Sequence, residues 1–202
     1  MPRLPLRPSA ADAILQAATS VLAADPSAPM DAVAAAAGVG RATLFRHHAN
    51  RDALLRAVAA RALDRLSARL GTLEAAGAPP AAALADLIDV LVGAGGELRF
   101  LLAHPALESD PPIAAAVRAI DLRIVPFVVA AQHAGVLRAD LPFAWVWRAT
   151  EALVYQAWAA VQDGTLAAAD AAAIVRQTVL GGLGGPAAPS ALSQPARAAS
   201  PP

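Results

Sequence analysis

Residues 30–55, MDAVAAAAGVGRATLFRHHANRDALL, decide the fold, because they contain two short helical segments separated by a glycine turn. The first segment, Met30–Ala36, is broken by Gly38, which can supply the positive φ of a tight turn. The second segment, Arg41–His48, ends before Asn50, a residue that caps a following helix well. Two helices this short cannot stand alone, so longer flanking helices must hold them.

The second segment, Arg41–His48, is predicted to have two different faces. Leu44 and His48 are one helical turn apart and point inward, toward a small core that the first segment completes. The predicted inward residues are Val33, Ala34, Ala37, Val39 and Leu44. The opposite face presents Ala42 and Arg46, flanked by Arg41, Thr43, Phe45 and His47. A helix whose basic and polar side chains point outward has the right size for the major groove of DNA.

The flanking sequence predicts further helices and no strands. Ser9 and Asp12 form a capping pair at the start of the first helix, which ends at Asp25-Pro26. β-Branched and aromatic residues never form short alternating runs, so we expect an all-α protein of about nine helices. Beyond residues 30–48, the predicted helices cover about 10–24, 51 to a glycine-bounded end near 71–77, 81–93, 97–104, 111–135, 142–163 and 167–183. Pro126 lies inside one of them and predicts a kink or a break there.

These elements predict two domains with a short segment at each end. The N-terminal head covers residues 9–55, with a helix-turn-helix at about 30–48, and consists of three short helices and the start of a long fourth. A helical domain over 56–183 is expected to bind a ligand and to dimerise. Residues 1–8, with three prolines and two arginines, predict a flexible arm, and 184–202 predict a disordered tail.

Charge is unevenly distributed although the formal net charge is zero. Residues 1–70 hold nine arginines and five acids, a net +4, and the remainder has a net −4. A basic first third favours a DNA-binding head, and chance combined with solvated helix faces is the alternative explanation. The absence of cysteine excludes disulfides and thiolate metal sites. We expect a cytoplasmic protein with no membrane partner, because the sequence shows neither a signal peptide nor an apolar run that could span a bilayer.

Residues 9–60 resemble the TetR family of bacterial repressors, through the motifs Met30–Ala34, Ala37-Gly38-Val39, Arg41–His47 and Asn50-Arg51. The resemblance implies that Arg41 contacts base edges, most naturally a guanine, and that Ala42 touches a thymine methyl group or a sugar. It places Thr43, Phe45, His47 and Arg51 against phosphates, and Arg46 within reach of either kind of contact. Gly40 begins this DNA-binding set in place of a common serine cap, and Phe45 replaces the usual tyrosine. His48 stands where a large apolar residue is usual.

The resemblance also implies a homodimer that binds a palindromic operator and responds to a small molecule. The last two long helices are expected to form the dimer interface, with an apolar surface of Trp145, Val146, Leu153, Trp158, Ile174, Val175 and Leu180. A small, largely apolar or aromatic effector is expected near Pro126. The candidate lining residues are Phe100, His104, Arg123, Phe127, Trp147 and Glu151. The same aromatic residues could instead fill the core or the dimer interface.

Other functions receive less support from the sequence. A DNA-binding module without a small-molecule inducer, constitutive or controlled by a protein partner, is the alternative. No catalytic motif, cofactor or metal site is predicted. His47 and His48 point about 100° apart on a helix, and Pro105 disrupts the spacing of His104 and Glu108. An enzyme of the helical-bundle type is remote, because the long helices carry no paired-carboxylate or Glu-x-x-His motif.

Overall fold

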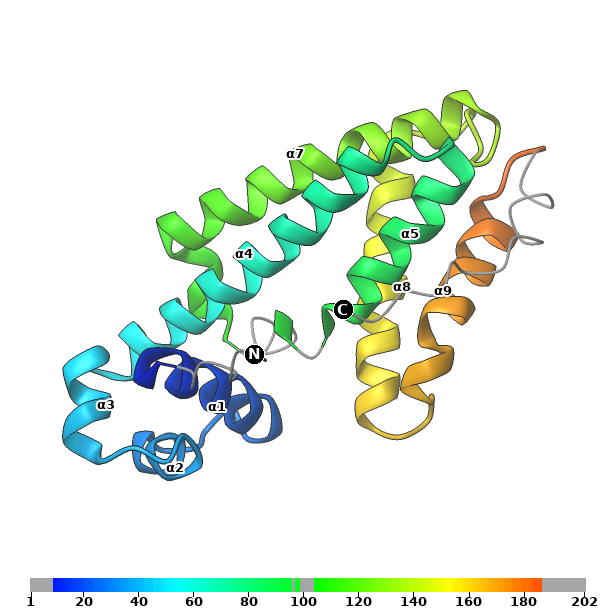
Figure 1. The fold of residues 1–202 in the computed structure, drawn as a ribbon. Coiled ribbons are helices and arrows are strands. Elements are labelled where there is room, and N and C mark those ends of the chain that lie inside the picture. The colour runs from blue at the N-terminus through cyan, green and yellow to red at the C-terminus, as the bar shows by residue number, and fades with distance from the viewer. Residues whose placement is uncertain (1–8, 96, 99–103, 187–202) are drawn as a thin grey trace, which may run out of the picture. The chain divides into compact units, whose positions relative to one another are not determined.

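The computed structural model describes residues 9–95, 97–98 and 104–186, and this part of the chain is helical (Figure 1). Within these described residues, eight α-helices with defined bounds, one 3-10 helix and a single isolated β-bridge between Leu137 and Gly184 are present. The helices are α1 (Ala10–Ala24), α2 (Met30–Ala36), α3 (Arg41–His47), α4 (Arg51–Ala76), α5 (Pro80–Gly93), η1 (Pro105–Ser109), α7 (Pro111–His133), α8 (Phe143–Gln162) and α9 (Ala168–Leu183). The predicted all-α class is confirmed.

Some sequence predictions fall outside the described residues. They are the arm at 1–8, most of the tail at 184–202, and the candidate ligand residue Phe100. Most of the helix predicted over 97–104 also falls there, while His104 directly precedes η1. Among the described residues, none of the helices combines the length and the apolarity that crossing a bilayer requires.

Packing contacts divide the chain into two compact units, which we call the head and the body. Among the described residues, the head comprises 9–64, 97–98 and 104–116, and the body comprises 65–95 and 117–186. α4 therefore begins in the head and ends in the body, as does α7. The sequence placed the end of the head at residue 55, whereas the packing divides the chain inside α4.

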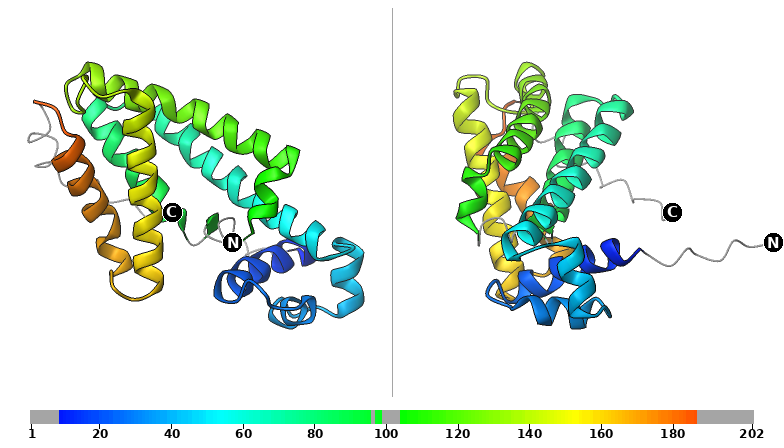
Figure 2. Two further views of the ribbon diagram at one scale, coloured as in Figure 1. Left: turned by 180° about the vertical axis from the view of Figure 1, so that it is seen from behind. Right: turned by 90° about the vertical axis from the view of Figure 1, so that its left-hand side faces the viewer.

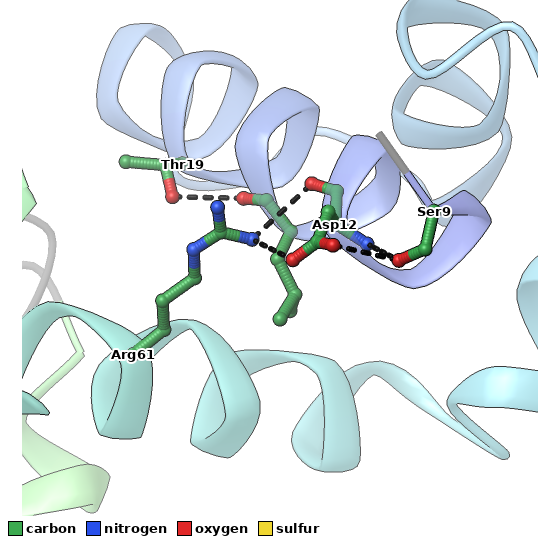
Figure 3. Close-up of polar contacts among 5 residues, drawn as sticks. Ser9, Asp12, Thr19 and Arg61 are labelled. Atoms are coloured by element: carbon green, nitrogen blue, oxygen red, sulfur yellow. Dashed lines mark hydrogen bonds and ion pairs between the residues drawn. The ribbon is translucent and has the colours of Figure 1, made fainter. Parts of the chain in front are cut away.

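The first turn of α1 is fixed by a side-chain cap and by α4 (Figure 3). The Ser9 hydroxyl accepts a hydrogen bond from the Asp12 N–H at 3.1 Å and donates to its carboxylate at 2.7 Å, so the predicted capping pair is confirmed. Arg61 of α4 donates to the Asp12 carbonyl oxygen at 3.2 Å and lies 3.4 Å from its carboxylate. Ile14, on the same helix, is fully buried. These contacts hold α1 against α4. The short helices α2 and α3, which lie between them in the chain, need such support because helices of this length are not stable alone.

α4 begins where the sequence predicted. The Asn50 side chain accepts a hydrogen bond from the Ala53 N–H at 2.8 Å, which satisfies one of the backbone donors that a helix start leaves unpaired. Leu54 and Val58 in the following turns are buried in the head, and Leu66 and Leu70 are buried in the body. One apolar stripe of α4 thus serves both cores.

The body is built on α5, α8 and α9, and the left view of Figure 2 shows α8 and α9 side by side. The Trp158 indole N–H of α8 donates to the Val92 carbonyl of α5 at 3.0 Å. Gly95 follows α5 so closely under this indole that a Cβ there would lie 2.2 Å from the ring. Arg176 of α9 forms an ion pair with Asp89 of α5. A buried aromatic contact and a charge pair therefore join the three helices.

α7 corrects one expectation, because it runs continuously from Pro111 to His133 with Pro126 inside it. A break at Pro126 is therefore wrong. Proline removes the N–H that would bond the carbonyl four residues earlier, here that of Leu122. The side chains of Leu122 and Pro126 are both exposed, Leu122 to 73%. The Leu122 carbonyl that loses this partner therefore lies on a side of the helix that water reaches. Solvent can satisfy it, and the helix continues.

Candidate DNA interface

The turn between α2 and α3 sets the position of the candidate recognition helix. Gly38 has φ +66°, as predicted. Its N–H donates to the Ala35 carbonyl at 3.1 Å, and the Val39 N–H donates to the Ala34 carbonyl at 3.0 Å. This pair of bonds is a Schellman motif, which needs a left-handed residue where Gly38 stands. The break between the two helices is therefore encoded locally.

Leu44 anchors α3 from the inside. Its side chain is fully buried, as is that of Val33 on α2, and Ala34 is buried beside them. α3 begins without a side-chain cap at Gly40, whose carbonyl accepts from the N–H groups of Thr43 and Leu44 at 2.9 and 3.1 Å. α3 is therefore held mainly by the burial of Leu44 on its inner face.

The other face of α3 carries the predicted DNA-binding side chains. Arg41, Ala42, Arg46 and His47 are exposed, and Thr43 and Phe45 are half-buried. The structure therefore brings seven of the eight predicted residues together on one short helix and its N-cap, Gly40. The set combines two guanidinium groups, an imidazole, a hydroxyl and a small apolar methyl group, which suit phosphates and base edges.

Arg41 is engaged on two sides. Its Nη1 donates to the Asp31 carboxylate of α2 at 2.8 Å. Its guanidinium carbon also lies 5.3 Å from the centre of the Phe45 ring, within the range of a cation–π contact. Both charged side chains are more than half exposed, so the ion pair contributes only about 0.2–1 kcal/mol. The pair orients Arg41 without adding much stability, and nothing in the sequence pattern predicts Asp31 as its partner.

Arg51, the eighth predicted residue, points elsewhere. Its two terminal nitrogens donate to the carbonyl oxygens of Pro26 and Ala28 in the loop between α1 and α2. In the same loop, hydrogen bonds from Ser27 lower the pKa of Asp25, and the charge of Arg51 lowers it further. In this structure Arg51 joins the start of α4 to that loop. Its contact with phosphate remains a prediction.

His48 closes α3 in an extended conformation, with its backbone N–H bonded to the Leu44 carbonyl. Its side chain is half-buried, and within the described part of the chain Nε2 is buried without a hydrogen-bond partner. Burial, and secondarily the charge of His47, lowers the pKa of His48. The inward position of His48 therefore favours the neutral imidazole.

The predicted ligand residues are spread over both units. His104 is half-buried and groups with the head, while Phe127 and Trp147 are half-buried in the body. Arg123 of α7 binds Glu74 of α4 through two bonds of 2.8 Å, and its Nη1 donates to the Ser67 carbonyl at 2.9 Å. Its guanidinium therefore holds α7 on α4 in the body.

Glu151, the other charged candidate for ligand binding, lies on α8. It accepts a hydrogen bond from the Tyr155 hydroxyl, one turn further along, at 3.1 Å. Tyr155 in turn packs against Trp158, with ring centroids 5.1 Å apart. Glu151 is half-buried, so its carboxylate lies at the edge of this aromatic pair.

The predicted dimer surface is only partly exposed. Trp145 and Ile174 are 61% and 43% exposed, as a partner surface requires. Val146, Trp158, Val175 and Leu180 are instead buried inside the protomer, so assigning them to an exposed surface was wrong. The physical reason is that α8 is apolar on most of its circumference, and periodicity alone does not say which side faces the protomer's own core.

Comparison with known proteins finds similarity along most of the chain. The family model described as bacterial regulatory proteins, tetR family, matches residues 14–58. The HTH-type transcriptional repressor LfrR of Mycolicibacterium smegmatis is 34% identical over 152 residues, which cover 75% of this chain and 79% of LfrR.

Solved structures give the same result for the fold. The LfrR structure in complex with proflavine, from Mycobacterium smegmatis, superposes with a TM-score of 0.72 at 30% identity, covering 86% of this chain and 96% of that one. The ketosteroid regulator KstR2 of Mycobacterium tuberculosis reaches a TM-score of 0.71 at 21% identity, covering 88% and 96%, and supports the fold alone.

Proposed function

The chain belongs to the tetR family of bacterial regulatory proteins, and from this premise we propose that it is a repressor that leaves a palindromic operator when a small, largely apolar or aromatic ligand binds. As a member of this family it is a DNA-binding transcriptional regulator. The observation that carries the proposal is the outward basic face of α3, with Arg41 and Arg46 exposed and Leu44 fully buried behind them.

α3 lies in the major groove and reads the operator through Arg41. A guanidinium recognises guanine with two parallel hydrogen bonds, to O6 and N7, and Ala42 beside it contacts a thymine methyl group or a sugar. Gly40, Thr43, Phe45 and His47 lie against the sugar-phosphate backbone and fix the register of the helix. Arg46 reaches a base or a phosphate. Arg51 adds a phosphate contact by leaving the loop carbonyls that it binds in the free protein.

The protein acts as a homodimer formed through α8 and α9. Trp145, Tyr155 and Ile174 are the large apolar side chains that these two helices leave exposed. An exposed apolar surface of this kind costs free energy in water and is typical of a protein-protein interface. A two-fold dimer presents two copies of α3, which match a palindromic operator.

The effector is a small, apolar or aromatic compound bound in the body. LfrR, 30% identical across most of both chains, has been solved in complex with proflavine, a flat aromatic dye. Phe127 and Trp147 are the aromatic candidates for stacking on such a ligand, and Glu151 and Arg123 are the polar candidates for orienting it. Because Arg123 already donates to Glu74 and Ser67 of α4, a ligand that takes this guanidinium competes directly with α4.

Release from DNA then follows from linkage between the two sites. A ligand shifts the protein toward the conformation that it binds more tightly, by no more than its difference in affinity for the two states. α4 runs from Arg51 in the head to Ala76 in the body. A shift of α4 in the body therefore also moves its N-terminal part, which holds α1 in the head through Arg61. No catalytic step is involved.

Selection of duplexes from a random pool by the full-length protein tests the DNA-binding part of the proposal. A palindromic motif should be enriched, and failure to enrich any sequence would refute sequence-specific repression. Proflavine tests the effector part. It should quench the tryptophan fluorescence of the DNA-free protein and weaken binding to the enriched duplex.

The first proflavine measurement uses the protein alone, because a flat dye also stacks between base pairs. Binding to the protein without any loss of operator affinity would favour the alternative, a DNA-binding module that no small-molecule inducer controls. A Trp147→Ala variant should bind proflavine more weakly and keep its affinity for the duplex, since the residue lies in the body.

A further inference from the structure

Asp31 of α2 forms an ion pair with Arg41, the residue predicted to read a base, and so affects which groups of DNA Arg41 can contact. The Asp31 carboxylate accepts a hydrogen bond from Arg41 Nη1 at 2.8 Å, across the turn that separates α2 from α3. Side chains of 58% and 69% exposure leave this ion pair on the surface, beside the predicted DNA-binding face. From these contacts we infer that Asp31 is a specificity-determining residue, which directs Arg41 to a base edge and away from phosphates. The inference rests on the proposed DNA-binding function.

The geometry restricts Arg41 on two sides. The Phe45 ring lies 5.3 Å from the guanidinium carbon, and the Asp31 carboxylate accepts a hydrogen bond from Nη1. A guanidinium carries five N–H donors in a planar fork, so the edge formed by Nε and Nη2 can still point outward. Two donors side by side match the O6 and N7 acceptors of guanine. The two contacts therefore leave Arg41 the edge that a guanine needs and hold it in a narrow range of orientations.

The charge of Asp31 adds discrimination between base and backbone. A phosphate that approaches Arg41 also approaches the carboxylate that Arg41 binds, and the two negative charges repel each other. The neutral edge of a guanine meets no such repulsion. Asp31 thus weakens the sequence-independent binding that phosphate contacts supply and has less effect on the base contact. Asp31 therefore increases specificity in two ways: it opposes the contact of Arg41 with phosphate, and it orients Arg41 for the contact with guanine.

The Asp31→Asn variant tests the inference, with the duplex enriched by the wild-type protein as the specific probe and a scrambled duplex as the non-specific one. The variant keeps the size of the side chain and removes its charge. Affinity for the scrambled duplex should rise more than affinity for the enriched one. The ratio of the enriched to the scrambled affinity should therefore fall about 1.4- to 5-fold, the range of an exposed charge pair. Selection with the variant should also show one position that is less restricted to guanine.

Salt dependence provides a second measurement. A newly gained phosphate contact should steepen the plot of log affinity against log salt by about one on the scrambled duplex. Asp52→Asn is the matched control, since it removes the same charge from an exposed aspartate of the head, at the start of α4. It should change the affinity ratio less than Asp31→Asn does. Equal effects of the two variants would show a general charge effect and overturn the inference.

A double-mutant cycle separates the role of Asp31 from any structural role. In an Arg41→Ala background, Asp31→Asn should no longer change the ratio or the base preference, because the side chain that it controls is gone. An unchanged ratio for Asp31→Asn in the wild-type background would refute the inference. If the wild-type protein enriches no sequence at all, it is the proposed function that fails, so the two failures are distinguishable.

Discussion

Replacing Leu44 with alanine should lower the unfolding temperature of the head and leave that of the body unchanged. Leu44 is fully buried between α2 and α3, which are seven residues each and gain their stability from what they bury. A buried Leu→Ala change costs about 2–5 kcal/mol, a large part of the total stability of about 5–15 kcal/mol that a domain has. At about 4–8 °C per kcal/mol for a domain of this size, the unfolding temperature of the head should fall by at least about 8 °C.

The distribution of tryptophan makes the two units separately visible. All three tryptophans, Trp145, Trp147 and Trp158, lie on α8 in the body. In Leu44→Ala, tryptophan fluorescence should therefore keep its wild-type unfolding transition, while circular dichroism shows an earlier loss of helix. Binding to the enriched duplex should be lost at temperatures above the lowered transition of the head, where the wild-type protein still binds.

A matched substitution gives the control. Leu122→Ala removes the same atoms from a side chain that is 73% exposed, and it should change stability by no more than about 0.5 kcal/mol. A common shift of the tryptophan transition and the helix signal in Leu44→Ala would refute this expectation. That result would mean that head and body unfold as one cooperative unit.

Three further predictions concern the body core, pH and assembly. Gly95→Ala should destabilise the body by about 1–3 kcal/mol in urea titration and shift tryptophan emission, because the added methyl group would overlap the Trp158 indole. Gly93→Ala, with open space around the added methyl group, should be neutral or slightly stabilising in the same titration. Burial lowers the pKa of His48 from its usual 6.5, so its contribution to stability is complete above that pH and is lost as the pH falls below it. His48→Leu should flatten this dependence in urea midpoints followed by circular dichroism between pH 8 and 5, and an unchanged slope would exclude His48 as the cause. Trp145→Glu should turn the proposed dimer into a monomer in light scattering at micromolar concentration, whereas Leu122→Glu, also on an exposed apolar site, should leave this dimer intact.

Local signals explain what the sequence predicted well. The bounds of α2 follow from Pro29 before it and Gly38 after it, and both residues constrain the backbone without help from the rest of the chain. The Ser9 and Asn50 caps are equally local, since each side chain bonds a backbone N–H three residues later. The outward face of α3 could be predicted because a single buried residue, Leu44, fixes the orientation of a seven-residue helix.

Long-range contacts explain what the sequence did not predict. The partner of Arg41 is ten residues away on another helix, and the carbonyl oxygens that Arg51 binds are 23 and 25 residues away. The partner of a long charged side chain depends on which groups the tertiary fold brings near it. The spacing of residues along the sequence does not predict those groups. For the same reason the apolar residues of α8 could not be divided between the protomer's core, where Trp158 lies, and the surface, where Trp145 lies.

Affinity of the Arg41→Ala variant for the enriched duplex and for a scrambled one, at the same salt concentration, tests base reading by α3 most directly. A bidentate contact to guanine is worth about 1–3 kcal/mol of discrimination, so the variant should lose that much on the enriched duplex, clearly less on the scrambled one, and relax one base position in a new selection. Equal losses on both duplexes, with the selected motif unchanged, would show that Arg41 contacts only phosphates and would contradict the account.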